Sequence, residues 1–210
     1  MCGIAGYIGV GKFYPKKLDI NKCLNLMKLR GPDFQDFKKF NFGKYDSLIC
    51  SSRLSIIDIN ERSNQPIEDS EGILSFNGEI YNYIELRKKL LEKKIIFKTQ
   101  SDTEVLLKYL NYYGLKKINE IHGMWSFAYF SKKKKKFFLC RDKFGEKPIF
   151  FSLDKNKTFT FGSNINYIRA LNKKKFEIDY DKIYDYLKFG FRSIYSGNNT
   201  FFKKINFVNP

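Results

Sequence analysis

Apolar residues occur along the chain in short, nearly continuous runs, separated by turns rich in glycine, asparagine, aspartate and lysine. Runs of about four to eight apolar residues between such turns are typical of strands that are buried on both faces. They predict strands over residues 4–10, 48–52, 73–76, 124–130, 137–141, 149–153 and 158–162. The last four strands follow one another through lysine- or aspartate-bearing turns, which predicts an antiparallel meander.

Between these strands the apolar residues recur with a helical period. The helices predicted in this way cover 19–27, 82–91, 165–171, 182–187 and a segment that follows Ser101. Asn82 with Glu85, and Ser101 with Glu104, have the spacing of helix-capping pairs. Strands at both ends of the chain with helices between them predict an α+β fold with antiparallel sheets, rather than a parallel doubly wound one.

The chain has 210 residues, 43% of them hydrophobic and 18% aromatic, which suffices for one sizeable core. We therefore expect a single domain over residues 1–210. No apolar run approaches the roughly 18–20 residues of a membrane span, and no basic segment leads into an apolar one as in a secretory signal. The four cysteines lack CxxC spacing, which indicates neither a zinc site nor a disulfide framework. These features predict a cytoplasmic protein with no metal site and no membrane partner.

The formal net charge of +17 makes nucleic-acid binding a hypothesis to weigh. The lysines are dispersed, however, and they accompany abundant Asn, Ile, Phe and Tyr, which are the residues of A/T-rich codons. Genome composition explains such a bias without a nucleic-acid partner. The one dense run, residues 132–136, lies between two aromatic-rich segments and is typical of a solvated hairpin turn. We therefore expect no nucleic-acid partner.

Candidate chemistry begins at the second residue. A small residue after the initiator allows Met1 to be removed, and Cys2 would then carry both a thiol and a free α-amine. Because an α-amine has a pKa of about 7.7–8.0, part of it is neutral at working pH and can accept the proton of the thiol. Such a cysteine needs no histidine, and the chain has only His122. The alternative is that Cys2 is a small buried hydrophobe, as many free cysteines are.

Three further motifs each have a structural and a functional interpretation. Arg53 is either a solvated residue at a strand end or a guanidinium fork for a substrate carboxylate. Asn77-Gly78 is either a tight turn or an amide and N–H pair that stabilises an oxyanion. Asp102 is either a charge in the first turn of a helix or the partner of a substrate ammonium. Together they fit a thiol that attacks the side-chain amide of an amino acid bound by both its ends.

In these motifs the sequence resembles the glutaminase domain of glutamine-hydrolysing asparagine synthetases, which are class II glutamine amidotransferases. The resemblance covers nearly the whole chain, and six motifs agree in order and spacing. They are Cys2-Gly3-Ile4-Ala5-Gly6, Arg30-Gly31-Pro32-Asp33, Arg53-Leu54-Ser55-Ile56-Ile57-Asp58, Asn77-Gly78-Glu79-Ile80-Tyr81-Asn82, Ser101-Asp102 and Arg141-Asp142-Lys143-Phe144-Gly145-Glu146-Lys147-Pro148. The second and third motifs point to asparagine synthetases rather than to other amidotransferases with an N-terminal cysteine.

The resemblance implies the N-terminal-nucleophile hydrolase fold, a four-layer α/β/β/α sandwich of two antiparallel sheets. It implies that Cys2 attacks L-glutamine, that Asn77 and Gly78 form the oxyanion hole, and that the thioester is hydrolysed to glutamate with release of ammonia. The substrate contacts it implies are Arg53 for the α-carboxylate, Leu54, Ser55, Ile56 and Ile57 for the pocket wall, and Glu79 with Asp102 for the α-ammonium.

Two features depart from the family pattern. Leu29 stands where the family usually has histidine, and we expect this to affect loop packing at most. The sequence stops at Pro210, where in the family the glutaminase domain gives way to a synthetase domain that uses ATP and aspartate. We expect that domain beyond residue 210, in a longer chain of which this is a fragment, or else on a separate partner. ATP and Mg²⁺ are expected only there, and no cofactor is expected within residues 1–210.

Two rival functions stay open at this point. One is another class II amidotransferase, which would amidate a sugar or a modified amino acid. The other is an inactive regulatory module that has kept the fold, although the intact Cys2, Arg53, Asn77 and Asp102 argue against it. The sequence also leaves open the ammonia acceptor and the formation of a homodimer.

Overall fold

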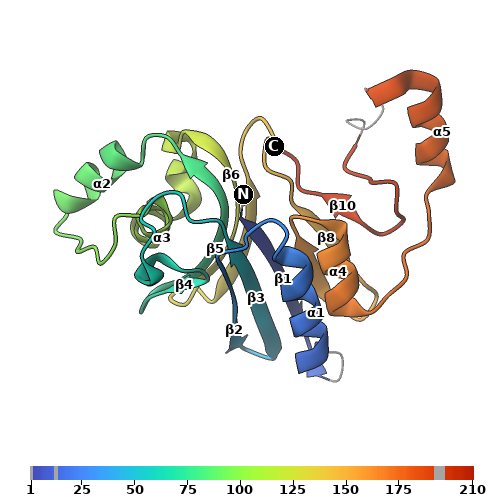
Figure 1. Cartoon of the computed structure of the whole chain (residues 1–210), viewed down its shortest axis with the longest axis horizontal. Coiled ribbons are helices and arrows are strands. Elements are labelled where there is room, and N and C mark those ends of the chain that lie inside the picture. The colour runs from blue at the N-terminus through green and yellow to red at the C-terminus, as the bar shows by residue number, and fades with distance from the viewer. Residues whose placement is uncertain (1, 12–13, 192–196) are drawn as a thin grey trace.

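The computed structural model describes residues 2–11, 14–191 and 197–210 of the chain. Met1, whose removal is predicted above, lies outside these ranges. Two antiparallel sheets face each other, and helices cover the outer face of each (Figure 1). The predicted four-layer α/β/β/α sandwich is therefore confirmed. Among the described residues, no helix has the length and apolar character needed to cross a membrane.

The larger sheet has six strands in the order β10-β8-β9-β1-β3-β2, and every neighbouring pair is antiparallel. Its strands are β1 (Gly3–Gly9), β2 (Phe34–Phe42), β3 (Tyr45–Arg53), β8 (Phe150–Leu153), β9 (Phe159–Gly162) and β10 (Asn206–Phe207). The first strand lies inside this sheet, between β9 and β3, so the residues just before it are brought next to the end of β3.

The smaller sheet has four strands in the order β4-β5-β6-β7, again antiparallel throughout. Its strands are β4 (Ile67–Glu68), β5 (Gly72–Ile80), β6 (Gly123–Ser131) and β7 (Lys136–Arg141). The lysine-rich segment 132–135 is the turn between β6 and β7, which confirms its prediction as a hairpin turn.

Side chains alternate between the two faces of each strand, and both faces are covered. In β1, Ala5 and Tyr7 pack toward the helices of the larger sheet, whereas Ile4 faces the smaller sheet. In β5, Phe76 packs toward the helices of the smaller sheet, whereas Ile73 faces the larger one. Because both faces are buried, these strands are written in the sequence as continuous apolar runs rather than as an alternation.

Helices α1 and α4 cover the larger sheet, and α2 and α3 accompany the smaller one (Figure 1). The helices are α1 (Lys17–Met27), α2 (Tyr83–Leu91), α3 (Asp102–Tyr113), α4 (Ile165–Asn172) and α5 (Tyr180–Phe189), with short 3-10 segments at Glu61–Ser63 and Gly114–Glu120. Helix α5 stands apart from the sandwich (Figure 1), and Lys182 is its one buried residue.

The two capping predictions have different outcomes. Ser101 caps α3, because its hydroxyl accepts the backbone N–H of Glu104 at 3.2 Å. The prediction for Asn82 was wrong: its side chain makes no capping bond to α2. It donates instead to the carbonyl of Glu120 at 2.9 Å and accepts the N–H of His122 at 3.0 Å. Asn82 therefore ties the start of α2 to the segment that enters β6.

Candidate active site

The pairing of β1 with β3 determines where Cys2 lies. The register places Gly3 opposite Ser52, so Cys2 is adjacent to the residues that follow β3. Its thiol donates to the carbonyl oxygen of Leu54, with 3.8 Å between Sγ and O. Burial raises the pKa of the Cys2 thiol above its ordinary value. The thiol is therefore protonated at neutral pH and needs a base before it can act as a nucleophile.

Asn77 and Gly78 lie within β5, not in the tight turn that their sequence also allowed. Asn77 is fully buried; its Nδ2 is 3.5 Å from the hydroxyl of Ser126, and its Oδ1 has no hydrogen-bond partner among the described residues. Because the contact of Nδ2 with Ser126 is long and weak, the amide N–H of Asn77 is available to a substrate oxygen. Position 78 requires glycine because the backbone of β6 approaches it closely: a Cβ there would lie 2.2 Å from the carbonyl oxygen of Met124.

Arg53, the last residue of β3, is 4% exposed and binds the loop that follows it. Nη1 donates to the carbonyl of Asn60 at 3.0 Å and to Oδ1 of Asn64 at 2.9 Å. Nη2 donates to the carbonyls of Ile57, at 3.2 Å, and Asp58. The four N–H bonds of the two terminal nitrogens are thus directed at the loop. A carboxylate bound by Arg53 would have to replace a loop oxygen or use Nε.

Asp102 begins α3 and is 6% exposed. Its Oδ2 accepts the backbone N–H of Ile80, the last residue of β5, at 3.1 Å. Burial raises the pKa of Asp102 to about 6, and the negative charge of Glu79 adds to this rise. No salt bridge in the described part of the chain joins Asp102 to a lysine or arginine. A buried carboxylate in this position is well suited to a small cationic group.

One cavity contains most of the predicted site residues, and its walls come from the end of β3, the second half of β5 and the start of α3. Figure 1 shows where these three elements lie in the fold. The predicted site residues that line the cavity are Cys2, Arg53, Leu54, Ile56, Ile57, Asn77, Gly78, Glu79 and Asp102. Ser55 is not among the lining residues; its backbone N–H donates to the carboxylate of Asp33 at 2.7 Å. Leu29, which departs from the family pattern, is 90% exposed and packs against little.

The cavity also contains residues that the sequence did not single out. Gln65 is 3% exposed and bridges two walls, because its Oε1 accepts the N–H of Phe76 at 2.7 Å and its Nε2 donates to the hydroxyl of Thr103 at 3.4 Å. Lys147 lines the cavity and is 6% exposed. A signal for Lys147 was its place in one of the six motifs, whereas Gln65 lies outside them all.

Comparison with known proteins places this arrangement in a family. The family model described as "Glutamine amidotransferase domain" matches residues 1–210. A putative glutamine-hydrolysing asparagine synthetase of Methanocaldococcus jannaschii is 37% identical in an alignment 209 residues long, and the alignment covers 91% of this chain and 40% of that protein. Asparagine synthetase 1 of Bacillus subtilis is 33% identical in an alignment 199 residues long, which covers 90% of this chain and 30% of that protein. The chain thus spans well under half the length of these relatives.

Solved structures agree on the fold. The glutamine phosphoribosylpyrophosphate amidotransferase of B. subtilis superimposes with a TM-score of 0.62 over 80% of this chain and 43% of its own, at 16% identity. A second structure, an allosteric regulatory enzyme of purine biosynthesis, gives a TM-score of 0.64 at 14% identity. One cavity contains a cysteine, an asparagine and an aspartate, and the sandwich around it is shared with the solved structures. Together with the family match over residues 1–210, this leads to one conclusion: the chain belongs to the glutamine amidotransferase domain family.

Proposed function

We propose that this domain hydrolyses L-glutamine to glutamate and ammonia through a thioester on Cys2. The observation that carries the proposal is the single cavity in which Cys2, Asn77 and Asp102 meet. A thiol, an oxyanion-stabilising amide and a carboxylate for an ammonium are the groups that this reaction needs. They come from separate segments before β1, within β5 and at the start of α3.

The reaction proceeds in two steps, formation of the thioester and its hydrolysis. The sulfur of Cys2 attacks the carboxamide carbon of glutamine, and the negative charge that develops on the oxygen is stabilised by the amide of Asn77 and the N–H of Gly78. When this intermediate collapses, the C–N bond breaks and the nitrogen takes up a proton. Ammonia is released, and a thioester between Cys2 and the glutamyl group remains. Water then attacks the same carbon, the C–S bond breaks, and glutamate and the free thiol are released.

The base in this proposal is the α-amine of Cys2 itself, exposed when Met1 is removed. A base is required because burial raises the pKa of the thiol. The amine is within reach of its own thiol, directly or through one water, and its ordinary pKa of about 7.7–8.0 leaves part of it neutral at working pH. It can also return the proton to the leaving nitrogen.

We further propose that the ammonia is used by a synthetase domain that converts aspartate to asparagine. The support is that the relatives named above are called asparagine synthetases and are much longer than this chain. ATP and Mg²⁺ would be bound by that other domain, in the same longer chain or in a separate subunit. The same names favour this acceptor over a sugar or a modified amino acid.

Glutamine turnover by the Met1-free protein is the direct test of this function. We expect equal amounts of glutamate and ammonia, measured by coupled enzymatic assays. A matched protein with one extra residue ahead of Cys2 keeps the thiol but converts its amine to an amide, and it should be about 10²–10⁴-fold slower. Absence of turnover in the Met1-free protein would refute the proposed function. Equal turnover in both proteins would refute the role of the amine.

Glutamine binding should depend on the ionisation of Asp102, whose pKa lies at about 6 in the free protein. The ammonium of glutamine favours the ionised carboxylate, so binding lowers this pKa. As pH falls below about 6, the free protein takes up a proton that glutamine must displace, and Kd should rise toward tenfold per pH unit. Above pH 7 Kd should be flat.

Calorimetric titration of the Cys2→Ala variant between pH 5 and about pH 8 measures this dependence without turnover. The variant that also carries Asp102→Asn has no titrating carboxyl at this position, so its Kd should be weaker and independent of pH over the same range. A pH dependence that survives Asp102→Asn would mean that another group binds the ammonium.

A further inference from the structure

The two ends of the proposed glutamine site belong to different layers of the sandwich. Arg53 ends β3 in the six-stranded sheet, whereas Asp102 begins α3, which packs on the four-stranded sheet. An amino acid bound by both its carboxylate and its ammonium fixes the distance between these residues. A contact that joins the loop after Arg53 to the segment before Asp102 therefore has direct consequences for binding.

Asp58 makes that contact, and it does so with both its backbone and its side chain. Its carbonyl oxygen accepts an N–H from Nη2 of Arg53. Its side-chain Oδ2 accepts the backbone N–H of Gln100, two residues before Asp102, at 2.6 Å. One residue thus contacts the proposed carboxylate end directly and the segment that leads into the ammonium end.

The conformation of Asp58 is specific to this bridging position. Its φ is +51°, in the left-handed region that non-glycine residues rarely adopt and that Asp and Asn tolerate best. Its side chain is only 4% exposed, and Oδ1 accepts the N–H of Asn60 at 3.4 Å. The bond from Gln100 is the chief cause that lowers the pKa of Asp58, so the carboxylate is ionised at neutral pH.

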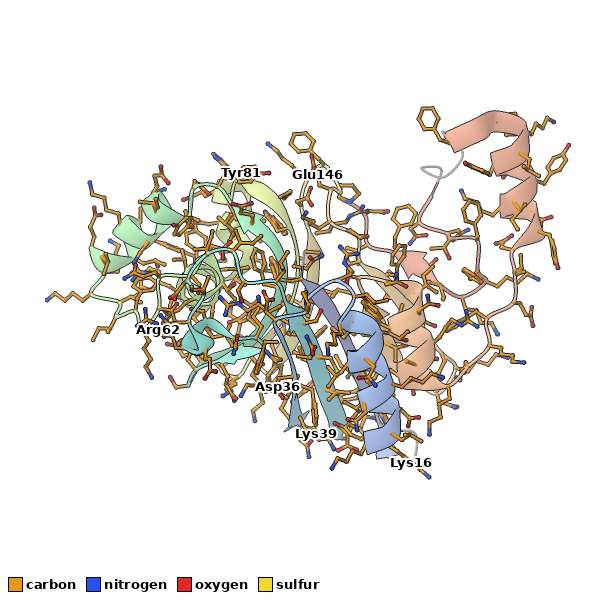
Figure 2. All side chains as sticks on the ribbon, in the orientation of Figure 1. Lys16, Asp36, Lys39, Arg62, Tyr81 and Glu146 are labelled. Carbon is orange, nitrogen blue, oxygen red and sulfur yellow. The ribbon has the colours of Figure 1, made fainter. Side chains whose placement is uncertain are left out.

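Two other side chains interact with the carboxylate of Asp58: the hydroxyl of Ser63, which also lowers its pKa, and the guanidinium of Arg62. Arg62 lies 3.5 Å from Oδ2 of Asp58, but its own side chain is 52% exposed, on the side of the molecule that carries α2 and α3 (Figure 2). An ion pair with so exposed a partner contributes little. The charge-assisted bond to the backbone of Gln100 is therefore the contact to test.

We propose that Asp58 is a positioning residue that holds the carboxylate and ammonium ends of the glutamine site in register. This inference rests on the proposed glutaminase function. Asp58 does not line the cavity, so it acts through Arg53 and the segment before Asp102 rather than on the substrate. Loss of the bridge lets the two ends move independently, which weakens binding of a ligand that needs both.

Two variants separate the bridge from the backbone conformation. Asp58→Gly adopts the positive φ without strain but has no side-chain acceptor. Asp58→Asn also tolerates this φ and keeps one neutral acceptor oxygen. We expect KM for glutamine to be lowest with Asp58, higher in Asp58→Asn and highest in Asp58→Gly. The increase for Asp58→Gly should be about tenfold, which corresponds to the loss of one hydrogen bond to a charged group. The value of kcat should change much less, because the groups that stabilise charge are untouched.

Gln100→Ala is the matched control, because it removes an exposed side chain and keeps the backbone N–H that Asp58 binds. Its KM should equal that of the wild type. The second readout is des-amino glutamine, which has no ammonium and cannot use both ends of the site. Its KM should be the same for wild type and Asp58→Gly, whereas a general loss of structure would weaken both substrates.

Three results would overturn the inference: unchanged KM for glutamine in a folded Asp58→Gly variant, an equal loss for both substrates, or an effect of Gln100→Ala as large as that of glycine. If Asp58→Gly does not fold, as judged by thermal unfolding, Asp58→Asn decides, since an unchanged KM in that variant overturns the inference equally. Failure of the proposed function is distinguishable, because the wild type itself would then not hydrolyse glutamine.

Discussion

Replacing Cys2 by alanine is expected to abolish glutamine hydrolysis and to leave the fold intact. The alanine side chain cannot form a thioester, so the whole reaction path is lost. The fold should survive because Cys2 is half-buried and belongs to none of the three hydrophobic clusters of the core. The measurement is glutamate release from glutamine, with thermal unfolding as the check on structure.

Cys140→Ala is the matched control for this variant. Cys140 is also half-buried, and burial raises its pKa to about 12, but it does not line the cavity that contains Cys2. It should retain wild-type turnover. Glutamine hydrolysis by Cys2→Ala at a substantial rate would mean that another nucleophile is at work, and equal loss in both variants would indicate damage to the fold.

Replacing Asn77 by alanine should lower kcat by about 10²–10³-fold and change KM far less. The reason is that the amide is needed where charge develops on the substrate oxygen, not where glutamine is held in its ground state. The surroundings of Asn77 suit this proposed role. The residue is fully buried in β5, and its Nδ2 is 3.5 Å from the hydroxyl oxygen of Ser126, which is a weak contact. Steady-state kinetics with glutamine provide both values.

Ser126→Ala separates this effect from a disturbance of β5. It removes the hydroxyl that the Asn77 amide contacts within the described part of the chain, but it keeps the amide itself. Its kcat should stay within a few-fold of the wild type. A variant Asn77→Ala that raised KM alone would show that Asn77 binds glutamine rather than stabilising the oxyanion.

Much of the fold could be predicted because its central strands are buried on both faces. Ile4, Ile49 and Phe127, for example, are fully buried and lie in short, nearly continuous apolar runs, which are typical of strands covered on both faces. The antiparallel pairs β6–β7 and β8–β9 were predicted correctly from the turns between them. The single four-strand meander was wrong, because β6 and β7 belong to the four-stranded sheet and β8 and β9 to the six-stranded one. The full four-layer arrangement came from the family resemblance, since periodicity alone does not say which sheets face each other.

The edge strand β2 was missed for a physical reason. Its neighbour β3 is its one strand partner among the described residues, and half-buried positions suffice for an edge. On one face Phe34, Phe40 and Phe42 share their side with Asp36 and Lys38, so neither face is uniformly apolar. The two-residue strands β4 and β10 are too short to produce any pattern at all.

The site could be predicted as a set of residues but not as a network. Chemistry and resemblance selected Cys2, Asn77 and Asp102, and the structure brings them into one cavity. That Arg53 directs both terminal nitrogens at its own loop depends on how residues 57–64 turn, which no motif encodes. The bridge from Asp58 depends in the same way on a left-handed backbone conformation, which the presence of an aspartate in the sequence does not predict.

Intact-mass analysis of an acid-quenched reaction tests the thioester on Cys2 most directly. Met1-free protein mixed with glutamine for a short time and denatured in acid should carry one added glutamyl group, and peptide mapping should place it on Cys2. The Cys2→Ala protein treated in the same way should show no added mass. A glutamyl group on any other residue, or full turnover with no adduct at any quench time, would contradict the proposed mechanism.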